Sequence, residues 1–142
     1  MPTAESEPRR PTWRELLAAY DRARDQWERD PSPHAFELLV TGGAMLTREL
    51  HKPGRVDLGQ VLLTPGASDA LLAAAQLPAE FLLRHHHGDW GELDPEDRRE
   101  NERALRLGGR LLSSYRTRLD AKLWIITEWD RSATTLLLPE EY

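Results

Sequence analysis

The sequence predicts an α+β protein in which an N-terminal helical hairpin and further helices pack on a three- to four-stranded, mainly antiparallel sheet. Three observations predict this class. Apolar residues recur at helical spacing over residues 12–52, proline-bearing start signals mark helices between residues 65 and 107, and three β-rich segments with alternating side chains follow. We therefore expect a flexible tail at residues 1–11, a helical hairpin at 12–52 and an α+β domain at 55–142.

The hairpin is predicted from its start and stop signals. A capping box at residues 12–15 opens the first helix, and the proline at residue 31 ends it. A cap followed by proline at residues 32–33 opens the second helix. Two glycines at residues 42–43 weaken this helix, so a break there stays open. Its inward stripe is expected to consist of Phe36, Leu39, Val40, Leu46 and Leu50.

The second unit is predicted to begin with a strand at residues 56–63. A Thr-Pro pair at residues 64–65 opens a helix that reaches about residue 75, and another short helix starts at residue 78. The sequence Gly88-Asp89-Trp90-Gly91 is expected to form a tight turn, because glycine on both sides lets the backbone reverse sharply. A strongly charged helix then covers residues 95–107.

The last part of the chain is predicted to be an antiparallel meander. Strand-like segments occupy residues 111–117, 123–129 and 132–138, and short connections join them. Polar and apolar residues mix on both faces of each segment, so the face that packs on the helices stays open.

Composition and charge exclude several classes of protein. The chain has 142 residues, 39% of them hydrophobic and 30% charged, which is enough for a core and excludes disorder throughout. The absence of cysteine excludes disulfides, thiol catalysis and cysteine-bound metal. The formal charge of −5 argues against a nucleic-acid partner. No apolar run reaches the roughly 20 residues of a membrane helix, so we expect a cytoplasmic protein without a membrane partner.

The helix at residues 95–107 has one row without arginine or glutamate, and two polar residues lie on it. Asp97 and Asn101 are one turn apart on the face expected to meet the sheet. Buried polar groups need hydrogen-bond partners. We expect both residues to be structural, holding the turn at residues 88–91 or the strands, with a site wall as the alternative.

Three consecutive histidines, His85-His86-His87, do not predict a metal site. Neighbouring helical residues point about 100° apart, so the three rings cannot share one ion easily. Only His85 shares a face with the apolar residues Phe81 and Leu82, so only His85 is expected inside. No cofactor motif is present either, and no cofactor is predicted.

One acid–base set can be drawn from the remaining polar residues. His85 would act as the acid and Glu128 as the base, while Arg110 or Arg131 would stabilise an anionic phosphorane. Such a set suits RNA cleavage without a metal ion. It gives an enzymatic alternative for this chain.

A dense pattern in the second unit resembles that of a known group of proteins. The pattern consists of Thr64-Pro65-Gly66-Ala67, His85, Gly88-Asp89-Trp90-Gly91, Asp97, Asn101, Arg110, Ser113, Tyr115, Trp124-Ile125-Ile126-Thr127-Glu128, Asp130-Arg131-Ser132, Thr134-Thr135, Leu138-Pro139 and Tyr142. It is similar to small bacterial, plasmid and phage proteins that mostly carry the labels "hypothetical" or "plasmid-related". Some of those proteins are labelled as related to a type I restriction methyltransferase subunit.

The resemblance covers residues 56–142 and implies a mobile-element or defence-related context. The methyltransferase label has no support in these residues. A glycine-rich cofactor loop and an Asn-Pro-Pro-aromatic motif are both absent, and 142 residues are too few for a full methyltransferase. The resemblance therefore implies no reaction and no site residue.

The binding residues expected in this chain are Asp89, Trp90, Tyr115 and Arg131. Arginine beside aromatic rings suits a carboxylate, phosphate or peptide ligand. In a competing structural account, Trp90 fills the core, Asp89 caps the turn and Arg131 pairs with Glu128. The function expected is that of an interaction module for a protein or a small anionic ligand, with a homodimer left open. The alternatives are the RNA-cleaving enzyme and a nucleic-acid-binding regulator.

Overall fold

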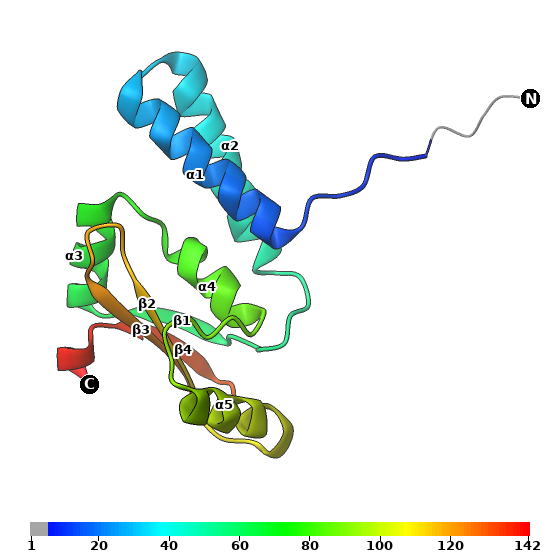
Figure 1. Ribbon diagram of the computed structural model, residues 1–142, viewed down its shortest axis with the longest axis vertical. Coiled ribbons are helices and arrows are strands. Elements are labelled where there is room, and N and C mark those ends of the chain that lie inside the picture. Colours follow the sequence, from blue (N-terminus) through cyan, green and yellow to red (C-terminus); the bar gives the residue numbers. More distant parts are fainter. Residues whose placement is uncertain (1–5) are drawn as a thin grey trace, which may run out of the picture. The chain divides into compact units, whose positions relative to one another are not determined.

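The computed structural model describes residues 6–142 and confirms the α+β class, with five α-helices and one four-stranded sheet in the described chain (Figure 1). In chain order, the elements are α1 (Trp13–Arg29), α2 (Pro33–Glu49), β1 (Gln60–Leu63), α3 (Pro65–Ala74), α4 (Pro78–His86), α5 (Pro95–Leu107), β2 (Leu111–Arg116), β3 (Lys122–Thr127), β4 (Ala133–Leu137) and the 3₁₀ helix η1 (Pro139–Glu141). Within the tail predicted at residues 1–11, residues 6–11 have no regular secondary structure, and residues 1–5 lie outside the described residues.

The chain divides into two compact units, Met1–Leu46 and Thr47–Tyr142. The sequence places this boundary later, at residues 52–55. The boundary falls inside α2 because Leu50, just after that helix, packs against the core of the second unit. Among the described helices, none combines the length and apolar content needed to cross a bilayer.

In the first unit, α1 and α2 form the predicted helical hairpin. The hydroxyl of Thr12 caps α1 by accepting a hydrogen bond from the Glu15 N–H at 3.2 Å. The helix α2 continues without a break through residues 42–43. At Gly42 a side chain would meet the ring of Tyr20, since an added Cβ would lie 3.1 Å from its Cδ2 atom. Glycine therefore lets the two helices approach closely, which offsets its low helix propensity.

The predicted inward stripe of α2 is only partly correct. Leu46 is fully buried, whereas Phe36 and Val40 are more than half exposed. Phe36 instead contacts the ring of Trp27 on α1, with centroids 5.7 Å apart. In a hairpin, each helix packs against only one other helix. The buried stripe of α2 is therefore narrower than the stripe predicted from the spacing of its apolar residues.

In the second unit, the sheet has the strand order β1-β4-β3-β2. The strands β2, β3 and β4 form the predicted antiparallel meander, and β1 pairs with β4 in parallel. The predicted first strand is shorter than expected, since Gly59 has a φ of +61° and interrupts it. Val56 and Leu58, which precede this glycine, are not part of β1, but their side chains lie in the core.

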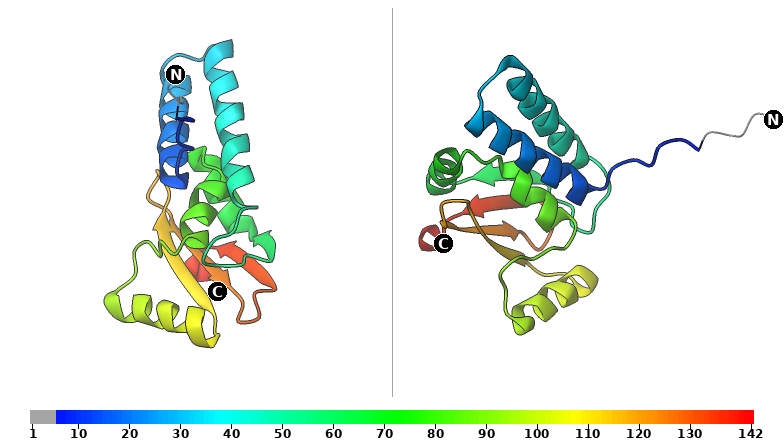
Figure 2. Two further views of the ribbon diagram at one scale, coloured as in Figure 1. Left: turned by 90° about the vertical axis from the view of Figure 1, so that its right-hand side faces the viewer. Right: turned by 45° about the horizontal axis from the view of Figure 1, so that its top comes forward.

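The structure also settles which face of the sheet packs on helices. Leu123 and Ile125 of β3 lie in one core cluster with Leu71 of α3 and Phe81 of α4. We call this the covered face. Alternate residues point to the other side, which we call the open face; it carries Leu112, Trp124, Ile126 and Leu137. The helix α5 lies beyond β2 at one edge of the sheet (Figure 2).

Candidate functional site

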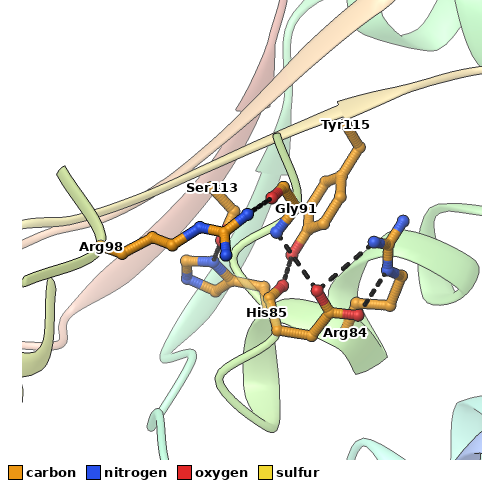
Figure 3. A network of polar contacts seen from close by, with 7 residues as sticks. Arg84, His85, Gly91, Arg98, Ser113 and Tyr115 are labelled. Atoms are coloured by element: carbon orange, nitrogen blue, oxygen red, sulfur yellow. Dashed lines mark hydrogen bonds and ion pairs between the residues drawn. The ribbon is translucent and has the colours of Figure 1, made fainter. Parts of the chain in front are cut away.

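The turn after α4 is built around Asp89, which contacts three residues labelled in Figure 3, namely Arg84, Gly91 and Tyr115. Its carboxylate pairs with Arg84, with 2.9 Å between Nε and Oδ2, and accepts a hydrogen bond from the Gly91 N–H at 3.2 Å. The Tyr115 hydroxyl donates to the Asp89 carbonyl oxygen at 2.5 Å, and the Arg84 guanidinium lies 4.5 Å from the Tyr115 ring centroid. Asp89 and Tyr115 therefore hold the turn against the sheet.

Gly91 is required for this close approach. Its φ is +72°, and an added Cβ would lie 2.1 Å from the Ser114 carbonyl oxygen, which no side chain tolerates. Trp90 beside it is 5% exposed, and its indole N–H donates to Glu102 at 3.2 Å. Trp90 thus fills the core, as the structural account of this turn expected.

His85 lies at the centre of a buried chain of hydrogen bonds on the covered face. Its Nδ1 is 2.5 Å from the Ser113 hydroxyl and its Nε2 is 2.8 Å from the Thr127 hydroxyl. Thr127 is in turn 2.8 Å from Thr134, whose hydroxyl donates to the Leu58 carbonyl oxygen at 2.6 Å.

The direction of this chain fixes the tautomer of His85. Thr134 uses its proton on a carbonyl, so it accepts from Thr127, and Thr127 must accept from His85. The proton is therefore on Nε2, and Nδ1 accepts from Ser113. Burial first, then the charges of His86 and Arg131, lowers the pKa of His85 to about 3. The ring is neutral, fully buried and without a free nitrogen for acid catalysis.

His86 is also buried, although only His85 was expected inside. Its Nδ1 is 2.7 Å from the Val56 carbonyl oxygen and its Nε2 is 2.8 Å from that of Lys52. Gly54 passes directly over the ring. His86 therefore fastens residues 52–56 to the end of α4.

Of the two polar residues predicted on α5, Asn101 has the expected role and Asp97 does not. Asn101 is 4% exposed; its Nδ2 donates to the Leu112 carbonyl oxygen at 2.6 Å, and its Oδ1 accepts from the Leu112 N–H at 3.1 Å. Asp97 is exposed. It lies in the first turn, beyond the contact with β2, where a solvated carboxylate is stabilised by the helix dipole. The helix is capped by Asp94, which accepts from the Asp97 N–H at 2.8 Å.

Arg131 has a structural position at the turn between β3 and β4. Its guanidinium donates to the carbonyl oxygens of Gly109, at 2.5 Å, and Ala104, at 3.1 Å, at the end of α5. It also donates to the main-chain oxygen of Glu128 at 3.0 Å, rather than pairing with the carboxylate as the structural account expected. The N–H groups of Arg131 that were expected to bind a ligand therefore bond to main-chain carbonyl oxygens instead.

Arg110 and Glu128 meet on the open face, away from His85. Thr127 contacts His85, and the next residue of the chain points to the opposite side, so strand alternation separates the predicted acid from the predicted base. Arg110 lies 3.6 Å from the Glu128 carboxylate, and its Nη1 donates to the Tyr142 hydroxyl at 3.1 Å. The hydrogen bond to Tyr142 is the main cause that raises the pKa of Arg110.

A slot of about 300 Å³ opens next to Arg110. Its lining residues are mostly apolar and comprise Arg110, Leu111, Leu112, Trp124, Ile126 and Tyr142. The rings of Trp124 and Tyr142 meet edge to face, with centroids 6.0 Å apart. The slot therefore combines two aromatic walls and an aliphatic floor with one half-exposed guanidinium at its rim.

Sequence reasoning named Arg110 and Glu128 but missed Trp124 and Tyr142 as site residues. A signal for Trp124 was present, since it shares a strand face with Ile126 and Glu128. The position of Tyr142 depends on η1, which brings the end of the chain back to β3. That return is tertiary, and no local pattern predicts it.

Neither a metal site nor a similar protein indicates what the slot binds. Over residues 6–142, no group of three His, Asp or Glu side chains is arranged to hold a metal ion. No family model, curated protein or solved structure matches the chain. The family resemblance seen in the sequence therefore stays a prediction.

Proposed function

We propose that this protein is a binding module whose open-face slot takes an aromatic or aliphatic group that carries a carboxylate. One observation carries this proposal: a guanidinium and a phenol hydroxyl stand at the rim of an apolar slot that has two aromatic walls. Such a pairing of an apolar pocket with a few convergent polar groups is typical of ligand sites. On the covered face, by comparison, the buried side chains of His85, Thr127 and Thr134 are hydrogen-bonded within the protein.

Arg110 is suited to a carboxylate ligand. It is cationic, about half exposed, and held at the rim by the hydroxyl of Tyr142. Its contact with Glu128, at 3.6 Å, is long for a charge-assisted hydrogen bond. A ligand carboxylate can therefore replace Glu128 and gain the shorter, bidentate geometry that a guanidinium offers.

The apolar part of the ligand is set by the slot. A volume of about 300 Å³ is at the lower end for small-molecule sites, so it holds one ring or a short branched chain. Trp124 and Tyr142 offer ring faces and edges to such a group. A small free acid and the C-terminal residue of a peptide share this chemistry. The resemblance seen in the sequence adds a mobile-element or defence-related context to the proposal.

Calorimetry or NMR titration with matched probes tests the proposal. The first pair is 3-phenylpropionate and its amide, and the second is Gly-Gly-Phe with a free or an amidated C-terminus. A ligand of this size is expected to bind with a Kd on the order of 1 mM. We expect each acid to bind roughly tenfold more tightly than its amide, which corresponds to about 1.4 kcal/mol. The pair with the higher affinity identifies whether free acids or peptide ends are preferred.

Two arginine variants supply the control. Arg110→Gln is expected to remove the preference for the acid. Arg116→Gln changes another exposed arginine of the same strand face, which is paired with Glu92 outside the slot, and is expected to keep the preference. Equal affinity of the acids and the amides for the parent protein would contradict the proposal, as would an acid preference that survives in Arg110→Gln.

A further inference from the structure

The two edges of the sheet differ in whether their main-chain groups are paired. At the β2 edge, the side chain of Asn101 binds both the N–H and the C=O of Leu112. Two residues on, Ser114 donates to the Trp90 carbonyl oxygen at 3.1 Å and accepts from the Glu92 N–H at 2.6 Å. The turn after α4 and the helix α5 therefore close this edge.

Within the second unit, all of whose residues the structure describes, the β1 edge has no such cover. The strand pairs with β4 on one side only and ends the strand order. The N–H groups of Gln60 and Thr64 point inward, to Ser132 and Leu136. In a parallel pair inward and outward residues alternate, so Val61 and Leu63 point their N–H and C=O groups outward. The side chains of Val61, Leu62 and Leu63 are each about 40% exposed, at 39%, 42% and 39%.

We infer that β1 pairs with β1 of a second copy of this chain, antiparallel and about a two-fold axis at Leu62. This register places Val61 of each copy opposite Leu63 of the other, where their outward groups form four main-chain hydrogen bonds. Gly59, with its φ of +61°, and Pro65, which lacks an N–H, limit pairing to the residues between them. No other antiparallel register pairs all the outward groups of Val61 and Leu63.

The lack of charged side chains on β1 favours pairing with a second copy. Exposed edges are usually protected from self-association by charged side chains, proline or a bulge, and Gln60–Leu63 has none of these. A second copy therefore brings no like charges together along the paired strands. On the open face, Leu62 meets Leu62 of the copy, with Cβ atoms about 5 Å apart.

The other face of β1 also fits the copy. Val61 borders an apolar hollow of about 390 Å³, and Leu58, Leu77 and Leu82 also line it. Leu63 of the copy would lie directly opposite Val61, at the border of this hollow. Pairing joins the two sheets into one of eight strands, whose outer edges are both closed β2 edges. The slot at Arg110 contains no β1 residue, so this inference is independent of the proposed function.

Val61→Pro is the sharpest test of the inferred dimer. The Val61 N–H points outward, so proline there removes no hydrogen bond to β4 but blocks the second copy. Sedimentation velocity across a wide concentration series should give a dimer for the parent and a monomer for Val61→Pro. The variant should still unfold cooperatively, with a melt like that of the parent at concentrations where the parent is monomeric. Leu72→Lys, which changes a leucine on α3 that is 76% exposed, is the matched control and should remain dimeric.

A charge exchange tests the two-fold axis even if Val61→Pro fails to fold. Leu62→Lys alone and Leu62→Glu alone should each be monomeric, because like charges would face each other at the axis. An equimolar mixture of the two should form a heterodimer. The inference is overturned if the parent is monomeric at every concentration, if folded Val61→Pro still dimerises, or if the mixture stays monomeric.

Discussion

The two faces of the sheet differ in how their polar side chains are placed. On the covered face, His85, Ser113 and Thr127 bond to one another and are fully buried. On the open face, Arg110 and Glu128 are each about half exposed and meet at 3.6 Å. Buried polar groups are stabilised by fixed partners, whereas solvent lets an exposed pair exchange partners. The covered face therefore carries structure, and the open face is where a ligand can compete.

The largest effect should come from breaking the covered face. His85→Leu leaves the hydroxyls of Ser113 and Thr127 buried without their partner, which costs about 2–4 kcal/mol of unfolding free energy. The matched change on the open face, Arg110→Leu, should cost less than about 0.5 kcal/mol. Urea unfolding measures both. Equal losses in the two variants would contradict the contrast between the faces.

Acid should lower the free energy of unfolding in a defined pH range, through the protonation of His85. The pKa of His85 is lowered from 6.5 in the unfolded chain to about 3 in the fold, so the folded state binds fewer protons. Its contribution is complete above pH 6.5 and is lost as the pH falls toward 3. This loss amounts to about 1.4 kcal/mol for each pH unit.

Urea unfolding between pH 7 and pH 4 isolates this contribution when the parent is compared with His85→Gln. Glutamine offers a donor and an acceptor but does not titrate in this range. The parent should lose more stability than the variant as the pH falls. Parallel pH profiles would show that His85 is not buried as a neutral ring.

The closed β2 edge gives an intermediate effect. Asn101→Leu removes both partners of the Leu112 main chain and should cost on the order of 1–3 kcal/mol. Asp97→Ala, on the same helix but exposed, should change the melting temperature very little. A melt of Asn101→Leu that coincides with that of the parent would refute the role given to this amide.

The smallest effect is expected on the open face. Glu128→Gln removes the carboxylate that competes for Arg110, and should tighten binding of 3-phenylpropionate by roughly two- to fivefold, or less than about 1 kcal/mol. The affinity for the amide probe should not change. Weaker binding of the acid to this variant would mean that Glu128 assists the ligand instead of competing with it.

Most of the fold was predictable because its signals are local. Caps, prolines and strand alternation predicted α3, α4, α5 and the meander close to their observed bounds. The parallel pairing of β1 with β4 and the choice of the covered face were not predictable, because they depend on contacts between residues far apart in the chain. Local patterns specify an element, whereas tertiary packing decides its neighbours.

The site was predicted only in part, for the same reason. Arg110 and Glu128 were both named from the sequence, but Glu128 was expected to pair with Arg131 and not with Arg110. The sequence also could not separate Glu128 from His85 without knowing which strand face is covered. Asp89, Tyr115 and Arg131 combine polar and aromatic groups, as binding residues do. Their main-chain partners, which make them structural, are visible only in the fold.

The indole N–H signals of Trp124 and Trp90 test the central claim most directly, because Trp124 lines the open-face slot and Trp90 is buried behind the covered face. Heteronuclear NMR spectra would be recorded during a titration with 3-phenylpropionate, with Trp124→Phe to assign the signal. The account predicts a saturable shift of the Trp124 indole and no shift of the Trp90 indole. A shift that is larger at Trp90, or no saturable shift at Trp124, would contradict it.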